Sequence, residues 1–290
     1  MKKVEEKFKN KKEKEMFFAR PTLPFALLLL FGGVLGAYEV RIHNAEELIN
    51  FSKSVSSGTS YSGSTVYLDS DIDFTPLSRE FQPIGKNETL SFQGIFDGQG
   101  HIISNLALNL SSVYVGLFGY TAGATIKNVV LDDSCSFTNS YSSSNPTIGS
   151  ISGYCASCAI ESIVNMESVA YIGSGSNFCV GGIVGRLTDL STIKNCVNYG
   201  TVTYSGNSTG DGQIGGITGM CAGSGTKSIQ NCANYGAITN NGESEDLYMG
   251  GIVGEFYYGI IVIENCVNGG RIMNSKQASV NNYIGSVVGY

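Results

Sequence analysis

A short glycine-containing pattern recurs six times along this chain, and it constrains the fold more than any other feature. Each copy ends in a glycine, and successive closing glycines lie 34, 32, 34, 35 and 35 residues apart. The six copies are YVGLFG (114–119), IGSISG (148–153), VGGIVG (180–185), IGGITG (214–219), MGGIVG (249–254) and IGSVVG (284–289). A nearly constant period in this range predicts stacked units, each burying its apolar face only against its neighbours.

Each unit contains short apolar runs separated by Gly or Asn turns. A second run follows each of the first five copies: TIKNVV (125–130), IESIVN (160–165), IKNCVNYG (193–200), IQNCANYG (229–236) and IENCVNGG (263–270). The repeats contain no 11-residue window with helical periodicity, which argues against leucine-rich, ankyrin and tetratricopeptide units. We therefore predict an all-β fold, a right-handed parallel β-helix with units of about 34 residues.

Stacking in register would place equivalent residues of successive units about 4.8 Å apart. Ile193, Ile229 and Ile263 should then form one inward column. The asparagines two positions further on should form a ladder of stacked amides, because Asn hydrogen-bonds to its own kind and also tolerates a left-handed corner. These asparagines are Asn195, Asn231 and Asn265.

The N-terminal part differs from the repeats. Residues 1–36 read as a basic segment followed by a signal peptide, because the apolar run from Phe25 to Leu35 is short for a membrane span. Cleavage near Gly36 would leave no membrane span in the mature chain. The alternative is an uncleaved signal anchor.

The mature chain should begin with a cap. Residues 37–75 are expected to form this cap and the first rung, and residues 43–55 suit an amphipathic helix with Asn44 as its N-cap. Residues 76–290 should form the β-helix repeats. Because a solenoid needs a polar terminal cap, we expect these repeats to be truncated or uncapped at Tyr290.

Charge excludes one class of partner. Residues 1–36 hold eight of the 18 basic and four of the 24 acidic residues, so the remainder carries a net charge of −10. Such a surface repels nucleic acid and anionic membranes. We therefore expect no nucleic-acid partner.

The region from 38 to 290 resembles the repeat proteins that carry the GLUG motif. Gly116-Leu117-Phe118-Gly119 matches that motif, and the later GIVG and GITG segments are close variants. The preceding FQGIFDGQGHIISNL (92–106) is also similar to the start of such repeats. The resemblance implies an extracellular or cell-surface β-helix of adhesin-like proteins, some of which also carry a peptidase domain. This chain shows no such domain.

Eight cysteines suggest two kinds of environment. Cys196, Cys232 and Cys266 occupy one repeat column, in which the earlier units carry Val129 and Ile163. A position shared with Val and Ile points into the core, so we predict a buried ladder of free thiols. Four other cysteines leave their pairing open, with a disulfide among them as one alternative. They are Cys155, Cys158, Cys179 and Cys221.

Metal and catalytic sites find little support. Asp69, Asp71, Asp73 and Glu80 have the spacing of a calcium loop, but Phe74 stands where the sharp turn needs Gly. The presence of only two histidines and the lack of a repeated set of carboxylates argue against a catalytic centre. We predict no metal, no cofactor and no catalysis, with a carbohydrate-active lyase or glycosidase as the alternative.

Ligand binding is the favoured hypothesis. One loop per unit precedes the glycine pattern, which would gather the loops on one side of the stack. Tyrosines in or beside these loops are the candidate binding residues, namely Tyr141, Tyr204, Tyr248 and Tyr283. We therefore expect a secreted or cell-surface scaffold for adhesion to a protein or glycan. A passive surface stalk is the rival interpretation.

Three sequons could accept glycans in a eukaryotic host. They begin at Asn87, Asn109 and Asn207. A glycoprotein is therefore a further expectation.

Overall fold

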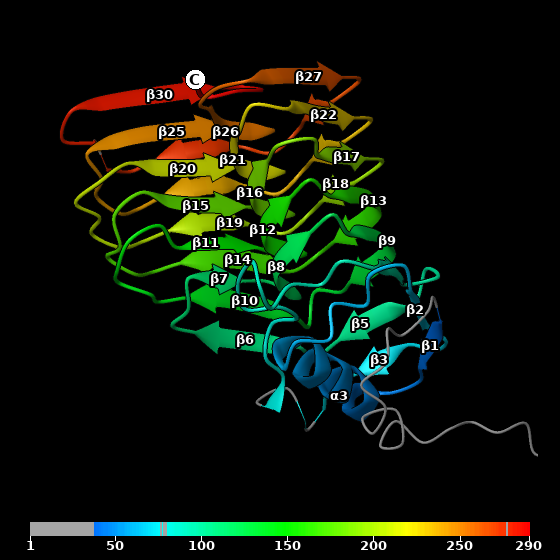
Figure 1. The fold of residues 1–290 in the computed structure, drawn as a ribbon. Coiled ribbons are helices and arrows are strands. Elements are labelled where there is room, and N and C mark those ends of the chain that lie inside the picture. The colour runs from blue at the N-terminus through cyan, green and yellow to red at the C-terminus, as the bar shows by residue number, and fades with distance from the viewer. Residues whose placement is uncertain (1–37, 76, 78–79, 277) are drawn as a thin grey trace, which may run out of the picture. The chain divides into compact units, whose positions relative to one another are not determined.

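A computed structural model describes residues 38–290, except 76, 78, 79 and 277 (Figure 1). The predicted basic segment and signal peptide lie outside the described residues. Within the described part of the chain, no helix is both long and apolar enough to cross a membrane.

Parallel strands stack into four sheets. Sheet 1 has 13 strands: β1 Glu39–Ile42, β2 Thr65–Leu68, β3 Ile72–Asp73, β4 Ile95–Asp97, β5 Ile102–Ser104, β9 Thr125–Leu131, β13 Ala159–Asn165, β17 Thr192–Lys194, β18 Val197–Asn198, β22 Thr226–Gln230, β23 Ala233–Asn234, β27 Ile260–Glu264 and β28 Val267–Asn268. Sheet 2 contains β6 Ala107–Leu110, β10 Ser136–Asn139, β14 Ser168–Tyr171, β19 Val202–Tyr204, β24 Ile238–Asn240 and β29 Ile272–Asn274.

Two further sheets complete each turn of the coil. Sheet 3 contains β7 Tyr114–Val115, β11 Thr147–Gly149, β15 Phe178–Gly181, β20 Gly212–Gly215, β25 Asp246–Gly250 and β30 Asn281–Gly285. Sheet 4 contains β8 Phe118–Ala122, β12 Ser152–Ala156, β16 Val184–Thr188, β21 Thr218–Ala222 and β26 Val253–Phe256. The chain passes through sheets 1, 2, 3 and 4 in turn and then returns to sheet 1, so the predicted parallel β-helix is confirmed (Figure 1).

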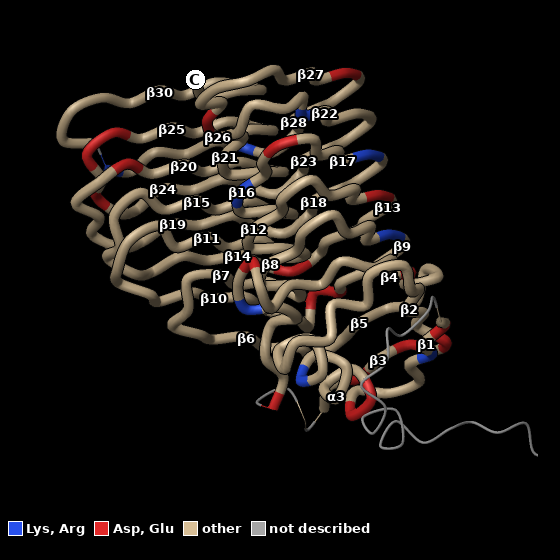
Figure 2. Tube along the Cα trace, in the orientation of Figure 1, with Lys and Arg blue, Asp and Glu red and all other residues tan. Residues whose placement is uncertain are grey.

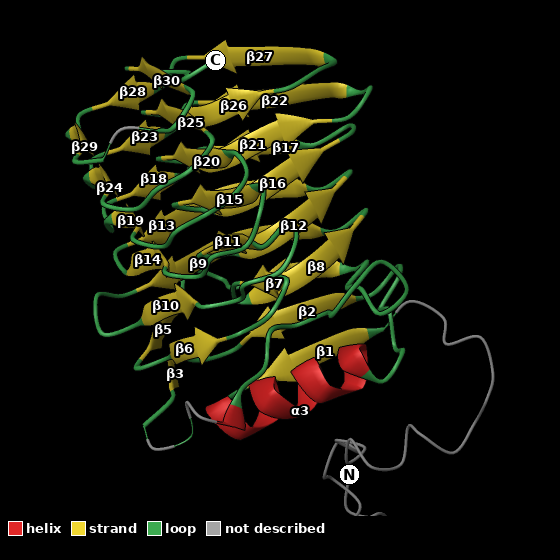
Figure 3. Cartoon of the chain, turned by 90° about the vertical axis from the view of Figure 1, so that its left-hand side faces the viewer, coloured by secondary structure: helices red, strands yellow, loops and turns green. Residues whose placement is uncertain are grey.

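The helix α3 (Ala45–Ser56) lies against the N-terminal end of the coil (Figure 3). The Asn44 side chain accepts a hydrogen bond from the Glu47 backbone N–H at 3.0 Å, which caps the helix start as predicted. Phe51 is fully buried, and its ring centroid lies 5.6 Å from that of Phe92 in the loop before β4. The apolar face of α3 thereby covers core residues of the first turns.

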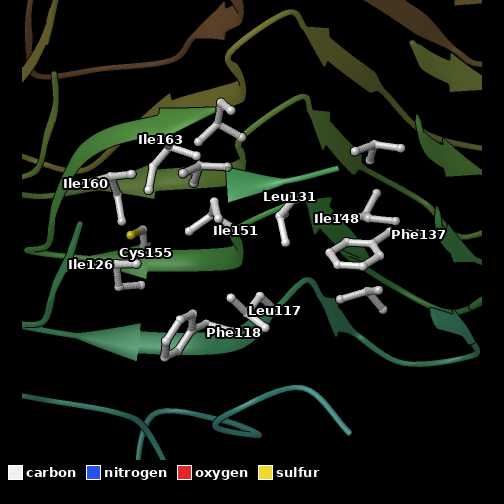
Figure 4. Packing of buried hydrophobic residues seen from close by; sticks show 14 of the residues in the cluster. Leu117, Phe118, Ile126, Leu131, Phe137, Ile148, Ile151, Cys155, Ile160 and Ile163 are labelled. Atoms are coloured by element: carbon white, nitrogen blue, oxygen red, sulfur yellow. The ribbon is translucent and has the colours of Figure 1, made fainter. Parts of the chain in front are cut away.

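The predicted columns are present in register. Ile193 pairs with Ile229, and Ile229 pairs with Ile263. Buried side chains of successive turns fill the interior of the coil (Figure 4). The closing glycines permit close approach of adjacent segments. A Cβ atom on Gly219 would lie 2.6 Å from the Val180 nitrogen and 2.8 Å from the Gly185 oxygen.

Two asparagine ladders run along the coil. The predicted ladder of Asn195, Asn231 and Asn265 is confirmed and is exposed: Asn231 donates to the Asn195 Oδ1 at 3.1 Å, and Asn265 donates to Asn231 at 3.2 Å. All three residues are left-handed, with φ between 53° and 55°. A second ladder, which the sequence analysis missed, is formed by Asn165, Asn198, Asn234 and Asn268. Its first three members are completely buried.

One buried carboxyl group makes stability depend on pH. Glu167 is 1% exposed, and burial raises its pKa well above the ordinary value. Because the folded-state pKa exceeds the unfolded-state pKa, its contribution to stability is complete below about pH 4 and is lost as the pH rises towards the folded-state pKa. We expect the melting temperature of the wild type to fall between pH 5 and 8 relative to that of Glu167→Gln. Parallel curves for the two proteins would contradict this prediction.

Candidate functional site

The four candidate tyrosines do not form one exposed loop surface. Tyr204 is completely buried: its hydroxyl donates to the Glu243 carbonyl at 2.8 Å and accepts from the Ser208 N–H at 2.7 Å. It therefore offers no ring face to a ligand, and the expectation for this residue is corrected. Tyr141 is half-buried in its loop.

The other two tyrosines lie on strands of sheet 3. Tyr248 on β25 and Tyr283 on β30 are register partners whose rings stack with centroids 4.9 Å apart. Tyr248 is only 8% exposed, whereas Tyr283 is half-buried. Both residues belong to a larger group of side chains on the outside of the coil.

Sheets 3 and 4 meet at a sharp corner, and their outward-pointing residues form a double column that we call the outer seam. The column on sheet 3 consists of Tyr114, Thr147, Cys179, Gln213, Tyr248 and Tyr283. The column on sheet 4 consists of Tyr120, Tyr154, Arg186, Met220 and Glu255. Cys179, Met220 and Ala222 form an apolar cluster that is separate from the main core.

Aromatic rings dominate the N-terminal half of the outer seam. Tyr120 and Tyr154 stack nearly parallel, with centroids 4.7 Å apart and an interplanar angle of 6°. Tyr114 packs edge-on against both rings, at 5.2 and 5.6 Å. The Arg186 guanidinium lies 5.6 Å from the centroid of Tyr154, which places a cation over the aromatic stack.

The middle of the outer seam carries polar groups without partners. The Arg186 Nε and the Thr147 Oγ1 are both buried, and neither has a hydrogen-bond partner among the described residues. The Cys179 thiol lies 3.3 Å from the Gln213 Oε1. Burial raises the pKa of Cys179 to about 12, so this thiol is protonated at neutral pH. Buried polar groups of this kind usually find partners.

Carboxyl groups gather at the C-terminal half. Glu255 is 6% exposed, and burial together with the nearby Asp211 carboxylate raises its pKa to about 7, although Arg186 opposes the shift. Burial also raises the pKa of Asp211. The Tyr248 hydroxyl lies 3.5 Å from the Asp246 Oδ2. Glu255 can therefore carry or release a proton near neutral pH. Elsewhere many charged residues lie in turns (Figure 2).

A shallow cavity lies beside the N-terminal end of the outer seam. Its volume is about 320 Å³, and Tyr114 forms part of its wall. The lining also includes the polar or charged Gln82, Lys86 and Ser112, together with the apolar Pro83 and Leu110. Seven of the eleven outer-seam side chains are therefore buried against their neighbours, while Tyr114, Tyr154, Arg186 and Tyr283 are half-buried.

The cysteine column is in register. Val164 pairs with Val197, and Val197 pairs with Ala233, so that Cys196 and Cys232 stack above Ile163. Cys196 and Cys232 are at most 1% exposed, whereas Cys266 is only partly buried. All eight cysteines are free in this structure. The predicted buried ladder therefore holds for its first two members.

Other candidate residues occupy ordinary surface positions. Asn87, Asn109 and Asn207 are exposed, and glycosylation stays a prediction. In the calcium-like segment, Asp71 accepts from the Ile102 N–H and Asp73 from the Thr75 N–H, both at 2.9 Å. Among the described residues, no group of three or more His, Cys, Asp or Glu side chains is arranged to hold a metal ion.

The sequence analysis did not identify the outer seam, whose two columns lie on either side of the glycine pattern. One column immediately follows the closing glycines, where the sequence reads Tyr120, Tyr154, Arg186, Met220 and Glu255. The chemical type changes from unit to unit there, while the adjacent apolar and glycine positions vary little. A variable column beside a constant motif was the signal that could have identified this surface.

Comparisons with known proteins agree with this architecture. Residues 176–203 match the GLUG motif. The fold is similar to the crystal structure of a protein from Bacteroides ovatus that is provisionally named an immunoglobulin A1 protease, with a TM-score of 0.63 and 25% sequence identity. The similarity covers 85% of this chain and 73% of that chain. No curated protein matches the chain.

Proposed function

We propose that this chain is a secreted or cell-surface scaffold that binds a protein or glycan along the outer seam, without catalysis. The observation that carries the proposal is the outer seam itself. Six successive units contribute residues to the outer seam, and these residues differ in chemistry from unit to unit. Four of them are half-buried and accessible in part, namely Tyr114, Tyr154, Arg186 and Tyr283. A purely structural column would favour one residue type, as the isoleucine and asparagine columns do.

The side chains suit recognition of a polar, partly apolar ligand. Tyrosine and arginine are enriched in binding surfaces because they combine a large contact area with hydrogen-bonding groups. The half-buried Tyr154 and Arg186 present such groups together, with the guanidinium 5.6 Å from the centroid of the Tyr154 ring. The acidic balance of the chain disfavours nucleic acid and anionic membranes as partners.

An extracellular location supports the same proposal. Residues 1–36 have the composition of an exported leader, and proteins with GLUG motifs are typically extracellular. N-terminal sequencing of the mature protein tests this part. A mature chain that begins near Ala37 is expected. A cytosolic product that keeps Met1, or Met16 as an internal start of translation, would contradict export.

Binding can be tested on arrays of glycans and extracellular-matrix proteins. Tyr154→Ala and Arg186→Ala should each weaken binding to an array ligand by about tenfold or more, since these two residues are half-buried and pack against each other in the outer seam. Tyr199→Ala is the matched control, because Tyr199 is 52% exposed and stacks on Tyr235 outside the outer seam. Thermal melting establishes that each variant is folded.

The outcomes separate the competing functions. Equal losses in all three variants, or a loss only in Tyr199→Ala, would place binding elsewhere. A wild-type chain that binds no ligand on either array would favour a passive stalk.

The acidic half of the outer seam supports a second candidate, a carbohydrate-active enzyme. A carboxyl group with a pKa of about 7 beside further carboxylates resembles the acid component of glycoside hydrolysis. Release of reducing ends from a polysaccharide by the wild type, abolished in Glu255→Gln, would favour this candidate. Absence of turnover together with binding would favour the scaffold.

A further inference from the structure

We infer that Cys155 and Cys158 form an oxidation site, at which a disulfide bond closes within a single turn of the coil. The two cysteines lie at the corner between β12 and β13 and are separated by two residues. One of these, Ser157, has a φ of 54°. This left-handed residue reverses the chain locally, so that both thiols reach the same part of the interior.

The contacts of the two thiols converge on one threonine. The Thr121 Oγ1 in the preceding turn lies 3.4 Å from the Cys155 Sγ and 3.2 Å from the Cys158 Sγ. Cys155 points into the apolar interior near Ile126 (Figure 4). Both cysteines are at most 2% exposed, and both belong to one turn, so a bond between them would leave the stacking of the turns unchanged.

Small residues of the adjacent turns lie next to Cys158. Thr125 and Thr192 both pair with Ala159, so Ala124 and Ser191 occupy the positions next to Cys158. The Cys158 N–H donates to the Ser191 Oγ at 3.0 Å, which fixes the backbone of the corner. Small neighbours allow the short rotations that joining two thiols requires.

The cysteine ladder is a less suitable place for a disulfide. Cys196, Cys232 and Cys266 belong to different turns, and in-register parallel neighbours project in the same direction about 4.8 Å apart. The Cβ atoms of a disulfide are usually 3.5–4.5 Å apart. A bridge between turns would therefore distort the stack, whereas a bridge between Cys155 and Cys158 would not.

The chemistry requires an external oxidant, which we specify as a small-molecule disulfide such as oxidised glutathione. One protein thiol loses its proton and attacks the oxidant, forming a mixed disulfide and releasing one glutathione thiol. The second protein thiolate then attacks the mixed disulfide, forming the protein S–S bond and releasing the second glutathione thiol. Two electrons and two protons pass to the oxidant. Because both thiols are buried, we expect this exchange during folding.

Peptide mass spectrometry of the full chain tests the inference. The chain is refolded with oxidised glutathione, its free thiols are alkylated in denaturant, and chymotrypsin cuts after Tyr154 and Tyr171. The resulting peptide contains Cys155 and Cys158 as its only cysteines. We expect an unalkylated peptide that lacks two hydrogens, and a full chain with six alkylated thiols. Prior reduction should restore all eight.

Variants and a second preparation keep the test decisive. Cys158→Ser should leave Cys155 fully alkylated under the same conditions. Should refolding fail, the same digestion is applied to chain exported into a bacterial periplasm. Full alkylation of both residues in folded, oxidant-treated wild type, or a bridge from either residue to another peptide, would overturn the inference. This result would leave ligand binding by the outer seam unaffected.

Discussion

Replacing Asn198 by Asp should destabilise the coil by about 3–5 kcal/mol, although the two side chains have nearly the same shape. The Asn198 Nδ2 donates to the Gly200 carbonyl at 2.9 Å and to the Asn234 Oδ1 at 2.8 Å. A carboxylate oxygen in its place would face two acceptors at hydrogen-bonding distance. Because Asn198 is completely buried, water cannot relieve this repulsion.

The exposed asparagine ladder provides the matched control. Asn231 makes equivalent amide contacts to Asn195 and Asn265 but lies in solvent. Asn231→Asp should therefore cost less than about 1 kcal/mol, since water solvates the new charge and Asp also tolerates the left-handed backbone. Urea unfolding followed by circular dichroism measures both variants. Similar shifts of the two unfolding midpoints would mean that the buried ladder contributes no more than the exposed one.

Replacing Cys232 by Asp should unfold the turns on either side of it. The Cys232 thiol is 1% exposed and faces the Gln230 carbonyl at 3.2 Å and the Ile193 carbonyl at 3.7 Å. Contact with the Cys196 thiol and burial raise the pKa of Cys232 to about 12, so the native group is neutral. A carboxylate would be charged, buried and surrounded by acceptors, at a cost of at least about 3 kcal/mol.

Cys232→Ala separates the effect of charge from that of volume. Loss of the sulfur should leave a small void and cost roughly 1 kcal/mol. Hydrogen exchange should show intact strands in Cys232→Ala and rapid exchange around β22, β23 and β28 in Cys232→Asp. Equal protection of these strands in the two variants would show that position 232 does not face the core.

The repeat period predicted the parts of the fold in which one residue type recurs. Ile193 and Ile229 could be placed in one inward column because their spacing equals one turn, and Asn195 and Asn231 could be placed at a corner for the same reason. Helix α3 was predictable because its apolar spacing and its Asn44 cap are local properties. In each case short-range chemistry and the stacking of turns specify the same arrangement.

The candidate site was less predictable, because short strands bend at several corners in each turn. The sequence pattern places Tyr204 at the start of a loop, yet β19 continues through this residue, and the alternation from Val202 places the Tyr204 side chain inside the coil. Asn198 lies only three residues after Asn195, but Asn195 is exposed on the outside of the coil, whereas Asn198 is completely buried. The outer seam depends on the angle between sheets 3 and 4, and a repeat alignment contains no information on that angle.

The register of the turns underlies the outer seam, both asparagine ladders and the core, and timed thiol labelling under reducing conditions tests it most directly. The structure predicts that Cys266, which is partly exposed, reacts first in the native protein, while Cys196 and Cys232 react only slowly. All eight cysteines should react at once in denaturant. Native labelling of Cys196 and Cys232 as fast as that of Cys266 would contradict the register.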